Sequence, residues 1–158
     1  MNFDSYNQAV ADAILAGTPG QAGGLPDFLG LRTVAVGPGT MTAEIDVRPD
    51  LLNPFGSLHG GVLSALVDHV LGAVLYPLIP PGTWAATTEF KLNLIAPVRE
   101  GTLSASSEVI AMSRRTAVDF RGVRVSKHTR NMVLWAEKRA GFRFHIAQGS
   151  WSGAAASA

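Results

Sequence analysis

A long apolar run at residues 62–80 constrains the fold of this 158-residue chain more than any other feature. It predicts a helix over about residues 61–76 that stops at Pro77 and the turn after it. Apolar side chains fall on nearly all sides of such a helix: Val62, Leu63, Leu66, Val67, Val70, Leu71, Val74 and Leu75. The helix must therefore be covered all round, by the rest of the chain or by another subunit.

The same run does not fit a membrane span. A helix that crosses a bilayer needs about 20 predominantly apolar residues with few or no charges. Asp68, His69, Gly72 and Pro77 interrupt the run. We therefore expect a buried helix of a soluble domain, without membrane insertion.

Segments of alternating polarity flank this helix and predict strands. Before the helix, residues 31–36 and 41–47 form a hairpin pattern around residues 37–39. After it, the expected strands are 87–95, 103–111, 116–125 with a bulge at Gly122, and 131–144 with a bend at Gly141. One long helix and about six strands predict an α+β fold in which a strongly curved antiparallel sheet wraps around the helix. A single small sheet is too narrow to enclose the helix, which indicates a partner subunit.

Length and composition favour one globular domain. Hydrophobic residues make up 47% of the chain and charged residues 16%, which argues against disorder. The expected parts are an N-terminal helix and loop in residues 1–30 (helix from Asp4 or Ser5, loop at 17–30), the main domain in residues 31–146, and a flexible tail in residues 147–158. The chain has no cysteine and no signal-peptide pattern at its start, so disulfides and cysteine chemistry are excluded and a cytoplasmic location is expected.

The turn before the helix and one acid within it suggest a catalytic site. Gly60 and Gly61 stand at the helix start, where bare backbone N–H groups can hold an oxygen that bears negative charge. Asp68 is a carboxylate on an otherwise apolar helix, which is costly unless the group is paired or used. An oxyanion site and a general base are the two parts needed to hydrolyse an acyl compound. Asp68 could instead bond Ser64 or a loop N–H and only fix the helix.

The other residues of the turn have structural interpretations beside the functional ones. Asn53 precedes Pro54, a position where asparagine favours a turn, so it can serve the turn or the chemistry. The place of His59 beside the Gly pair favours positioning over acid–base catalysis. Asp68 lies seven residues past Gly61, which is about 10 Å along a helix. Because one acyl group cannot easily reach both ends of that gap, we expect a site shared across a two-fold dimer interface.

Basic side chains are concentrated in residues 114–143, which carry nine of the thirteen Lys and Arg residues and only two of the twelve acids. The segment has a net charge of +7, and the rest of the chain carries −6. Such a patch suits a polyanion, either nucleic acid or a phosphorylated cofactor, and it is equally compatible with a solvated sheet face. It lacks a recognition helix or an aromatic stacking platform, so nucleic-acid binding is not expected. His69, His128 and His145 lack acid or Cys neighbours at ligand spacing, so no metal site is expected.

The segment NPFGSLHGG, followed by LVD with its acid nine residues after His59, resembles the hotdog-fold acyl-CoA thioesterases of the phenylacetate-degradation (PaaI-like) type. The resemblance covers about residues 30–145 and includes the later segment LNLIAPV. It implies a hotdog fold, in which a curved antiparallel sheet wraps around one long central helix. It also implies homodimers that join their sheets edge to edge and commonly pair into tetramers.

The resemblance also implies a role for each motif residue. Asp68 would be the general base or the nucleophile, and the N–H of Gly60 would polarise the thioester carbonyl. Asn53 and His59 would orient the reacting group or water, and Thr87 would lie beside that water. In this family a Gly-Arg/Lys-Thr turn often contacts the phosphates of coenzyme A (CoA). Here the segment reads Ser113-Arg114-Arg115-Thr116, so Arg114 replaces the expected glycine and Arg115 suits a phosphate.

The expected function is hydrolysis of an acyl-CoA thioester to a free acid and CoA, with no cofactor beyond the CoA of the substrate. A hotdog 3-hydroxyacyl-thioester hydratase or dehydratase and a non-catalytic acyl-CoA binding module are the alternatives. The residues do not specify the acyl group. Tyr76, Trp84 and Phe55 can line its pocket or belong to the core.

Overall fold

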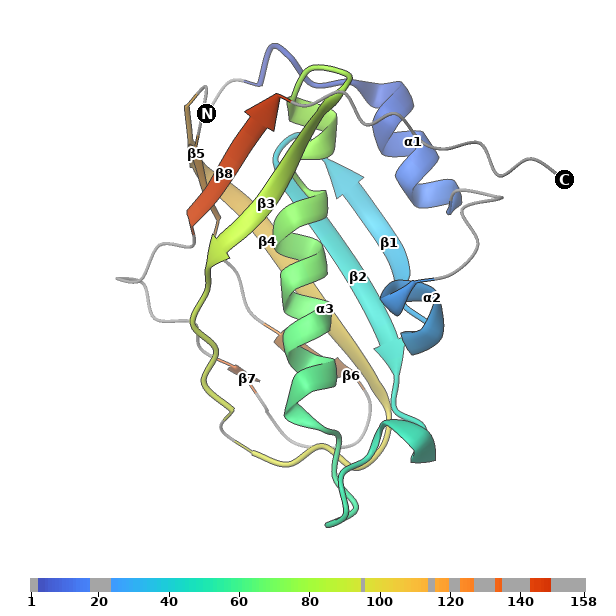
Figure 1. Ribbon diagram of the computed structural model, residues 1–158. Coiled ribbons are helices and arrows are strands. Elements are labelled where there is room, and N and C mark those ends of the chain that lie inside the picture. Colours follow the sequence, from blue (N-terminus) through green and yellow to red (C-terminus); the bar gives the residue numbers. More distant parts are fainter. Residues whose placement is uncertain are drawn as a thin grey trace, which may run out of the picture.

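The fold is that of a computed structural model, which describes residues 3–17, 24–94, 96–113, 116–119, 123–126, 133–134 and 143–148 (Figure 1). Its helices are α1 (Gln8–Ala16), α2 (Leu25–Leu29) and α3 (Gly60–Ala73), with short 3-10 turns η1 (Pro49–Leu51) and η2 (Tyr76–Leu78). Its strands are β1 (Arg32–Gly37), β2 (Thr40–Asp46), β3 (Thr83–Glu89), β4 (Thr102–Met112), β5 (Thr116–Asp119), β6 (Val123–Ser126), β7 (Val133–Leu134) and β8 (Arg143–Gln148).

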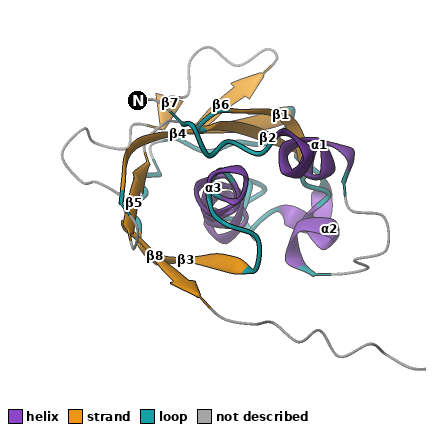
Figure 2. Ribbon diagram, turned by 90° about the horizontal axis from the view of Figure 1, so that it is seen from above, coloured by secondary structure: helices purple, strands orange, loops and turns teal. Residues whose placement is uncertain are grey.

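The strands form one antiparallel sheet that curves around α3. The order is β1-β2-β4-β5-β8-β3, and β6 pairs with β4 and with β7. Figure 2 shows the sheet on three sides of α3, with α1 and α2 beside the side that the sheet leaves open. The predicted α+β architecture, a curved sheet wrapped around one long helix, is therefore confirmed.

The core lies between one face of α3 and the concave face of the sheet. Buried residues alternate with partly exposed ones along β2 and β4, as the period of two in a strand requires. They pack against the buried side chains of α3, which are Leu63, Leu66, Val67, Val70 and Leu71. The one buried hydroxyl on this face of β4 has a partner, because Ser107 Oγ donates a 2.7 Å hydrogen bond to the Val70 carbonyl. This bond ties the helix to the sheet.

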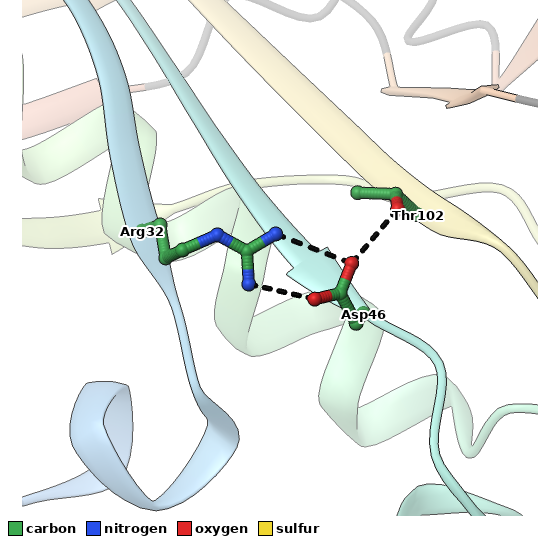
Figure 3. A network of polar contacts seen from close by, with 3 residues as sticks. All are labelled: Arg32, Asp46 and Thr102. Carbon is green, nitrogen blue, oxygen red and sulfur yellow. Dashed lines mark hydrogen bonds and ion pairs between the residues drawn. The ribbon is translucent and has the colours of Figure 1, made fainter.

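A polar network holds the first strands of the sheet together at one end (Figure 3). The Arg32 guanidinium on β1 donates two hydrogen bonds to the Asp46 carboxylate on β2, of 2.8 and 3.2 Å. Thr102 Oγ1 on β4 donates a third to the same carboxylate, at 2.8 Å. The bonds from Arg32 and Thr102 lower the pKa of Asp46 from its ordinary value.

Helix α3 is not buried all round by its own chain, which agrees with the expectation that a single small sheet is too narrow to enclose it. Gly61 and Asp68 are exposed, and Ala65, Gly72 and Ala73 are only partly covered. Residues Gly60–Leu78 are long and apolar enough to cross a bilayer by length and composition, and half of that window is buried inside the protein. The buried half is the face that packs on the sheet.

Two N-terminal predictions are wrong in detail. Helix α1 begins after Asn7, whose side chain accepts a hydrogen bond from the Val10 N–H, rather than at Asp4 or Ser5. The predicted loop at 17–30 contains α2, which has a proline in its first turn and ends at Gly30 in the left-handed conformation. Pro and Gly are turn residues in general, but at these positions they start and stop a short helix.

Two strand predictions after α3 are also wrong, whereas the hairpin at 31–47 and the strand at 103–111 are confirmed. The strand expected at 87–95 is β3 at Thr83–Glu89, because β8 pairs with that stretch. The strand expected at 131–144 is divided between β7 and β8. The expected bulge at Gly122, the bend at Gly141 and nearly all of the tail at 147–158 lie outside the described residues.

Candidate active site

The loop before α3 is organised by Asn53. Its Oδ1 accepts hydrogen bonds from the N–H groups of Phe55 and Ser57, at 2.9 and 3.2 Å. Gly56 adopts a φ of 72°, which favours glycine, and donates its N–H to the Asn53 carbonyl. The structural interpretation of Asn53 as a turn residue is therefore confirmed, and its role toward a substrate stays a prediction.

His59 is the N-cap of α3. Its Nδ1 accepts a 3.0 Å hydrogen bond from the Gly61 N–H. The prediction of a bare N–H group is therefore wrong for Gly61. Because Nδ1 is the acceptor, the neutral imidazole carries its proton on Nε2, and the exposed side chain can present that N–H as a donor. Histidine is not among the usual N-cap residues, so sequence patterns did not indicate this role.

Gly60 is the first residue of α3, and its N–H makes no hydrogen bond within the described part of the chain. It lines a cavity of about 280 Å³ together with Asn53, Ser57 and Leu94. A Cβ at Gly60 would come within 2.7 Å of Leu94 Cδ1. A side chain at this position would therefore crowd the space beside a backbone donor that has no partner in the described structure.

Asp68 is exposed on the third turn of α3. The described residues give it no hydrogen bond or ion pair, and Ser64 Oγ donates instead to the Gly60 carbonyl at 2.9 Å. The alternative in which Ser64 holds Asp68 is therefore wrong. Asp68 lines a groove of about 860 Å³ between α3 and β3, and Thr87 lines the same groove. The structure thus brings these two predicted site residues to one cavity.

Thr87 stands next to an irregularity in β3. The register with β8 shifts between Thr87 and Glu89, which is a β-bulge. Residues 85–90 all line the groove, so consecutive strand residues reach the same space. Bulges commonly re-aim side chains in this way beside functional sites.

His69 is a groove residue that the sequence did not assign to the site. It lies beside Asp68 in the chain and lines the same groove. Burial lowers the pKa of its imidazole below the ordinary value, and the negative charge of Asp68 opposes this effect. The available signal was its spacing of four residues from Ala65 and from Ala73, which places the three residues on one side of the helix.

The predicted oxyanion donor and the predicted general base do not lie close together within one chain. Gly60 and Asp68 are eight residues apart on α3, which corresponds to about 12 Å along the helix axis. They line different cavities, and His59 lines a third of about 320 Å³. Arg114 and Arg115 lie outside the described residues. Among the described residues, no group of three or more His, Asp or Glu side chains could hold a metal ion.

Comparison with known proteins identifies the family of this chain. The model of the thioesterase superfamily matches residues 55–120. A 1,4-dihydroxy-2-naphthoyl-CoA hydrolase of Listeria monocytogenes is 30% identical over 95 residues, which is 60% of this chain and 77% of that protein. The chain belongs to the thioesterase superfamily. The relatives by sequence are named as hydrolases and esterases, so this member of the superfamily is an enzyme of the thioester hydrolase type.

Solved structures of thioesterases share the fold. The Escherichia coli PaaI protein, from the phenylacetic acid degradation operon, superimposes with a TM-score of 0.70 at 19% identity, and the match covers 89% of this chain and 98% of that one. A thioesterase from Haemophilus influenzae gives a TM-score of 0.69 at 22% identity and covers 80% and 85%. The resemblance to hotdog thioesterases of the PaaI-like type is therefore confirmed at the level of family and fold.

Proposed function

We propose that this thioesterase hydrolyses an acyl-CoA thioester to a free carboxylic acid and CoA. One observation carries the proposal. Asp68 is a carboxylate without a hydrogen-bonding partner in the described structure, and it lines a groove with Thr87 in a chain of the thioesterase superfamily. The Listeria relative is named for a CoA thioester, which supports CoA as the thiol part of the substrate. The CoA belongs to the substrate, and the proposal needs no other cofactor.

In this mechanism Asp68 takes a proton from water as the water oxygen bonds to the thioester carbon. The C–S bond then breaks, and the CoA thiolate leaves and takes up a proton. Direct attack by Asp68, through a mixed anhydride that water then opens, is the other route open to the same carboxylate. The Gly60 N–H and the positive end of the α3 dipole stabilise the oxyanion.

The distance between Gly60 and Asp68 supports a site shared by two subunits. A two-fold dimer with antiparallel α3 helices brings Gly60 of one chain to Asp68 of the other. His59 and Asn53 then position the carbonyl or water at the Gly60 end, and Thr87 does so at the Asp68 end. The same proposal includes a dimer-of-dimers tetramer, CoA-phosphate contacts from Arg114 and Arg115, and a cytoplasmic location. A monodisperse monomer with full activity would contradict the shared site.

Replacement of Asp68 tests the central claim. Asp68→Asn keeps the shape of the side chain but removes the base, so kcat for acyl-CoA hydrolysis is expected to fall by about 100- to 10,000-fold. Glu89→Gln is the matched control, because Glu89 is a second carboxylate on the same groove. Turnover is followed by release of free thiol, and folding by circular dichroism. Near-wild-type turnover of Asp68→Asn would remove Asp68 from the mechanism.

The same assays separate the two alternative functions. A hydratase or dehydratase would change enoyl absorbance without releasing thiol. A binding module would take up acyl-CoA with neither signal. Either result with a correctly folded protein would overturn the hydrolase proposal.

A further inference from the structure

A second cavity lies next to the groove that Asp68 lines. This cavity has a volume of about 650 Å³ and is lined by residues of α1, α2, β1 and α3. Figure 2 shows α1 and α2 beside the side of α3 that the sheet leaves open. Three residues line both cavities: His69, Ala73 and Tyr76. They are spaced by four and three residues along α3 and the η2 turn that follows it, so they form one stripe. We call this stripe the neck and the second cavity the α1 chamber.

The middle of the neck carries little side-chain volume. Ala73 contributes a single methyl group there, and Gly72 next to it contributes no side chain. A Cβ built on Gly72 would meet no atom within 4 Å, so there is open space beside the helix at this point. Among the three residues that line both the groove and the α1 chamber, only His69 and Tyr76 carry large side chains.

The α1 chamber is suited to an apolar group. Ile14 and Leu15 of α1 and Leu31 before β1 line it. Two charged residues, Asp27 and Arg32, also line it. The Arg32 guanidinium is bound to the Asp46 carboxylate at 2.8 Å, and Asp27 is not without a partner either. Its volume lies within the range of about 300–1,000 Å³ that is usual for small-molecule sites.

The neck is compatible with the passage of an apolar group at neutral pH. Burial lowers the pKa of the His69 imidazole, so the ring is uncharged there. Tyr76 offers an aromatic ring, and its side chain is partly exposed. Neither residue places a full charge between the two cavities.

The distance along the helix from Asp68 to the neck determines how long an acyl group must be to reach the α1 chamber. Ala73 is five residues beyond Asp68, about 7.5 Å along the axis of α3, and Tyr76 lies three residues further, in η2. An acetyl group with its carbonyl at Asp68 ends before Ala73, whereas a medium-chain or aryl acyl group extends to Ala73 or past it.

We propose that the α1 chamber receives the distal part of a large apolar acyl group, and that His69, Ala73 and Tyr76 determine which acyl sizes the enzyme accepts. This inference rests on the proposed function, because it takes Asp68 as the position of the thioester carbonyl. These three residues are specificity determinants and take no part in the bond-breaking steps.

Binding of unreactive CoA ketones tests the inference without turnover. In acetonyl-CoA and 2-oxodecyl-CoA the carbonyl is joined to carbon instead of sulfur, so neither compound can be hydrolysed. Isothermal titration calorimetry on the wild-type protein is expected to give a Kd for 2-oxodecyl-CoA at least about 10-fold lower than that for acetonyl-CoA. Ala73→Val and then Ala73→Leu fill the neck in steps, so this ratio is expected to fall stepwise toward one while the Kd of acetonyl-CoA changes by less than about 2-fold.

Ala65→Leu is the matched control. Ala65 lies on the same helix and lines the same groove, but it does not line the α1 chamber. Its replacement is expected to leave the ratio of the two Kd values unchanged. Equal affinity of wild type for the two ketones, or an equal loss for both in Ala73→Leu, would overturn the inference. If the ketones bind as expected but acyl-CoA releases no thiol, the proposed function fails and the chamber stands.

Discussion

Replacement of Gly60 by proline would remove one backbone N–H and leave the helix start in place. Gly60 is the first residue of α3, the position where proline is best tolerated in a helix. Proline also requires an extended residue before it, and His59 already has φ −65° and ψ 132°. The substitution therefore tests the proposed oxyanion donor with little change to the backbone.

The size of the effect follows from a comparison with Gly60→Ala. Both substitutions add a Cβ, which meets Leu94 Cδ1 at 2.7 Å unless the leucine moves. Leu94 is 58% exposed, so its side chain has room to turn away. The two variants then differ chiefly in the N–H group. Loss of one oxyanion donor lowers kcat by about 100- to 1,000-fold, or about 2.7–4 kcal/mol of transition-state stabilisation.

The assay is thiol release from saturating acyl-CoA, with urea unfolding at one protein concentration as the measure of folding. We expect Gly60→Pro to be about 100- to 1,000-fold slower than Gly60→Ala, with closely similar unfolding midpoints. A folded Gly60→Pro enzyme as fast as Gly60→Ala would refute the role of this N–H.

Mixing Gly60→Pro with Asp68→Asn extends the test to the shared site. A mixed dimer has one site with both mutations and one with neither, provided that Gly60 and Asp68 act across the interface. After exchange of subunits in equal amounts, half of the dimers are mixed and about a quarter of wild-type activity should return. No recovery after demonstrated exchange would place Gly60 and Asp68 of one chain in the same site.

Two further predictions concern stability. His59→Ala removes the acceptor for the Gly61 N–H and is expected to lower the free energy of unfolding by about 0.5–2 kcal/mol in urea, whereas His59→Asn supplies a new cap and should restore most of it. Asp46 has a folded pKa below its ordinary 3.8, so the unfolded chain binds the proton first as pH falls. The contribution of the ionised Asp46 to the free energy of unfolding is therefore present above about pH 3.8 and is lost as pH falls through the folded pKa. Because the Arg32–Asp46 pair is exposed, this contribution is only about 0.2–1 kcal/mol. Asp46→Asn should abolish this part of the pH dependence of stability.

Periodicity predicted the elements whose burial follows a simple rule. The central helix and the alternating strand at 103–111 each place their apolar residues on the face that the structure buries. The strand at 87–95 failed because alternation marks two faces of extended chain but does not fix which residues pair. Pairing with β8 selects Thr83–Glu89, and nothing in the local sequence specifies that register.

The site shows the same division between local and tertiary information. Asp68 and Gly60 could be singled out because a carboxylate and a Gly pair are unusual in an apolar run. The cap by His59 was missed because the usual N-cap residues are Ser, Thr, Asp and Asn. Tyr76 was a candidate for the acyl pocket, but Ala73 was missed because its position becomes meaningful only when α1 and α2 lie beside the open side of α3.

The open side of α3 explains how one helix can serve both the core and the site. Its sheet side carries the large apolar residues, such as Leu66 and Leu71, which are almost fully buried. Its open side carries mostly small residues, such as Ala65, Gly72 and Ala73. At about 25 cal/mol per Å² of apolar surface, small side chains lose little when they stay uncovered, so the helix can leave this side to a groove and to the charge of Asp68 without giving up its core. Large residues there would close the groove, which is why filling the neck at Ala73 should alter acyl selection before it alters the fold.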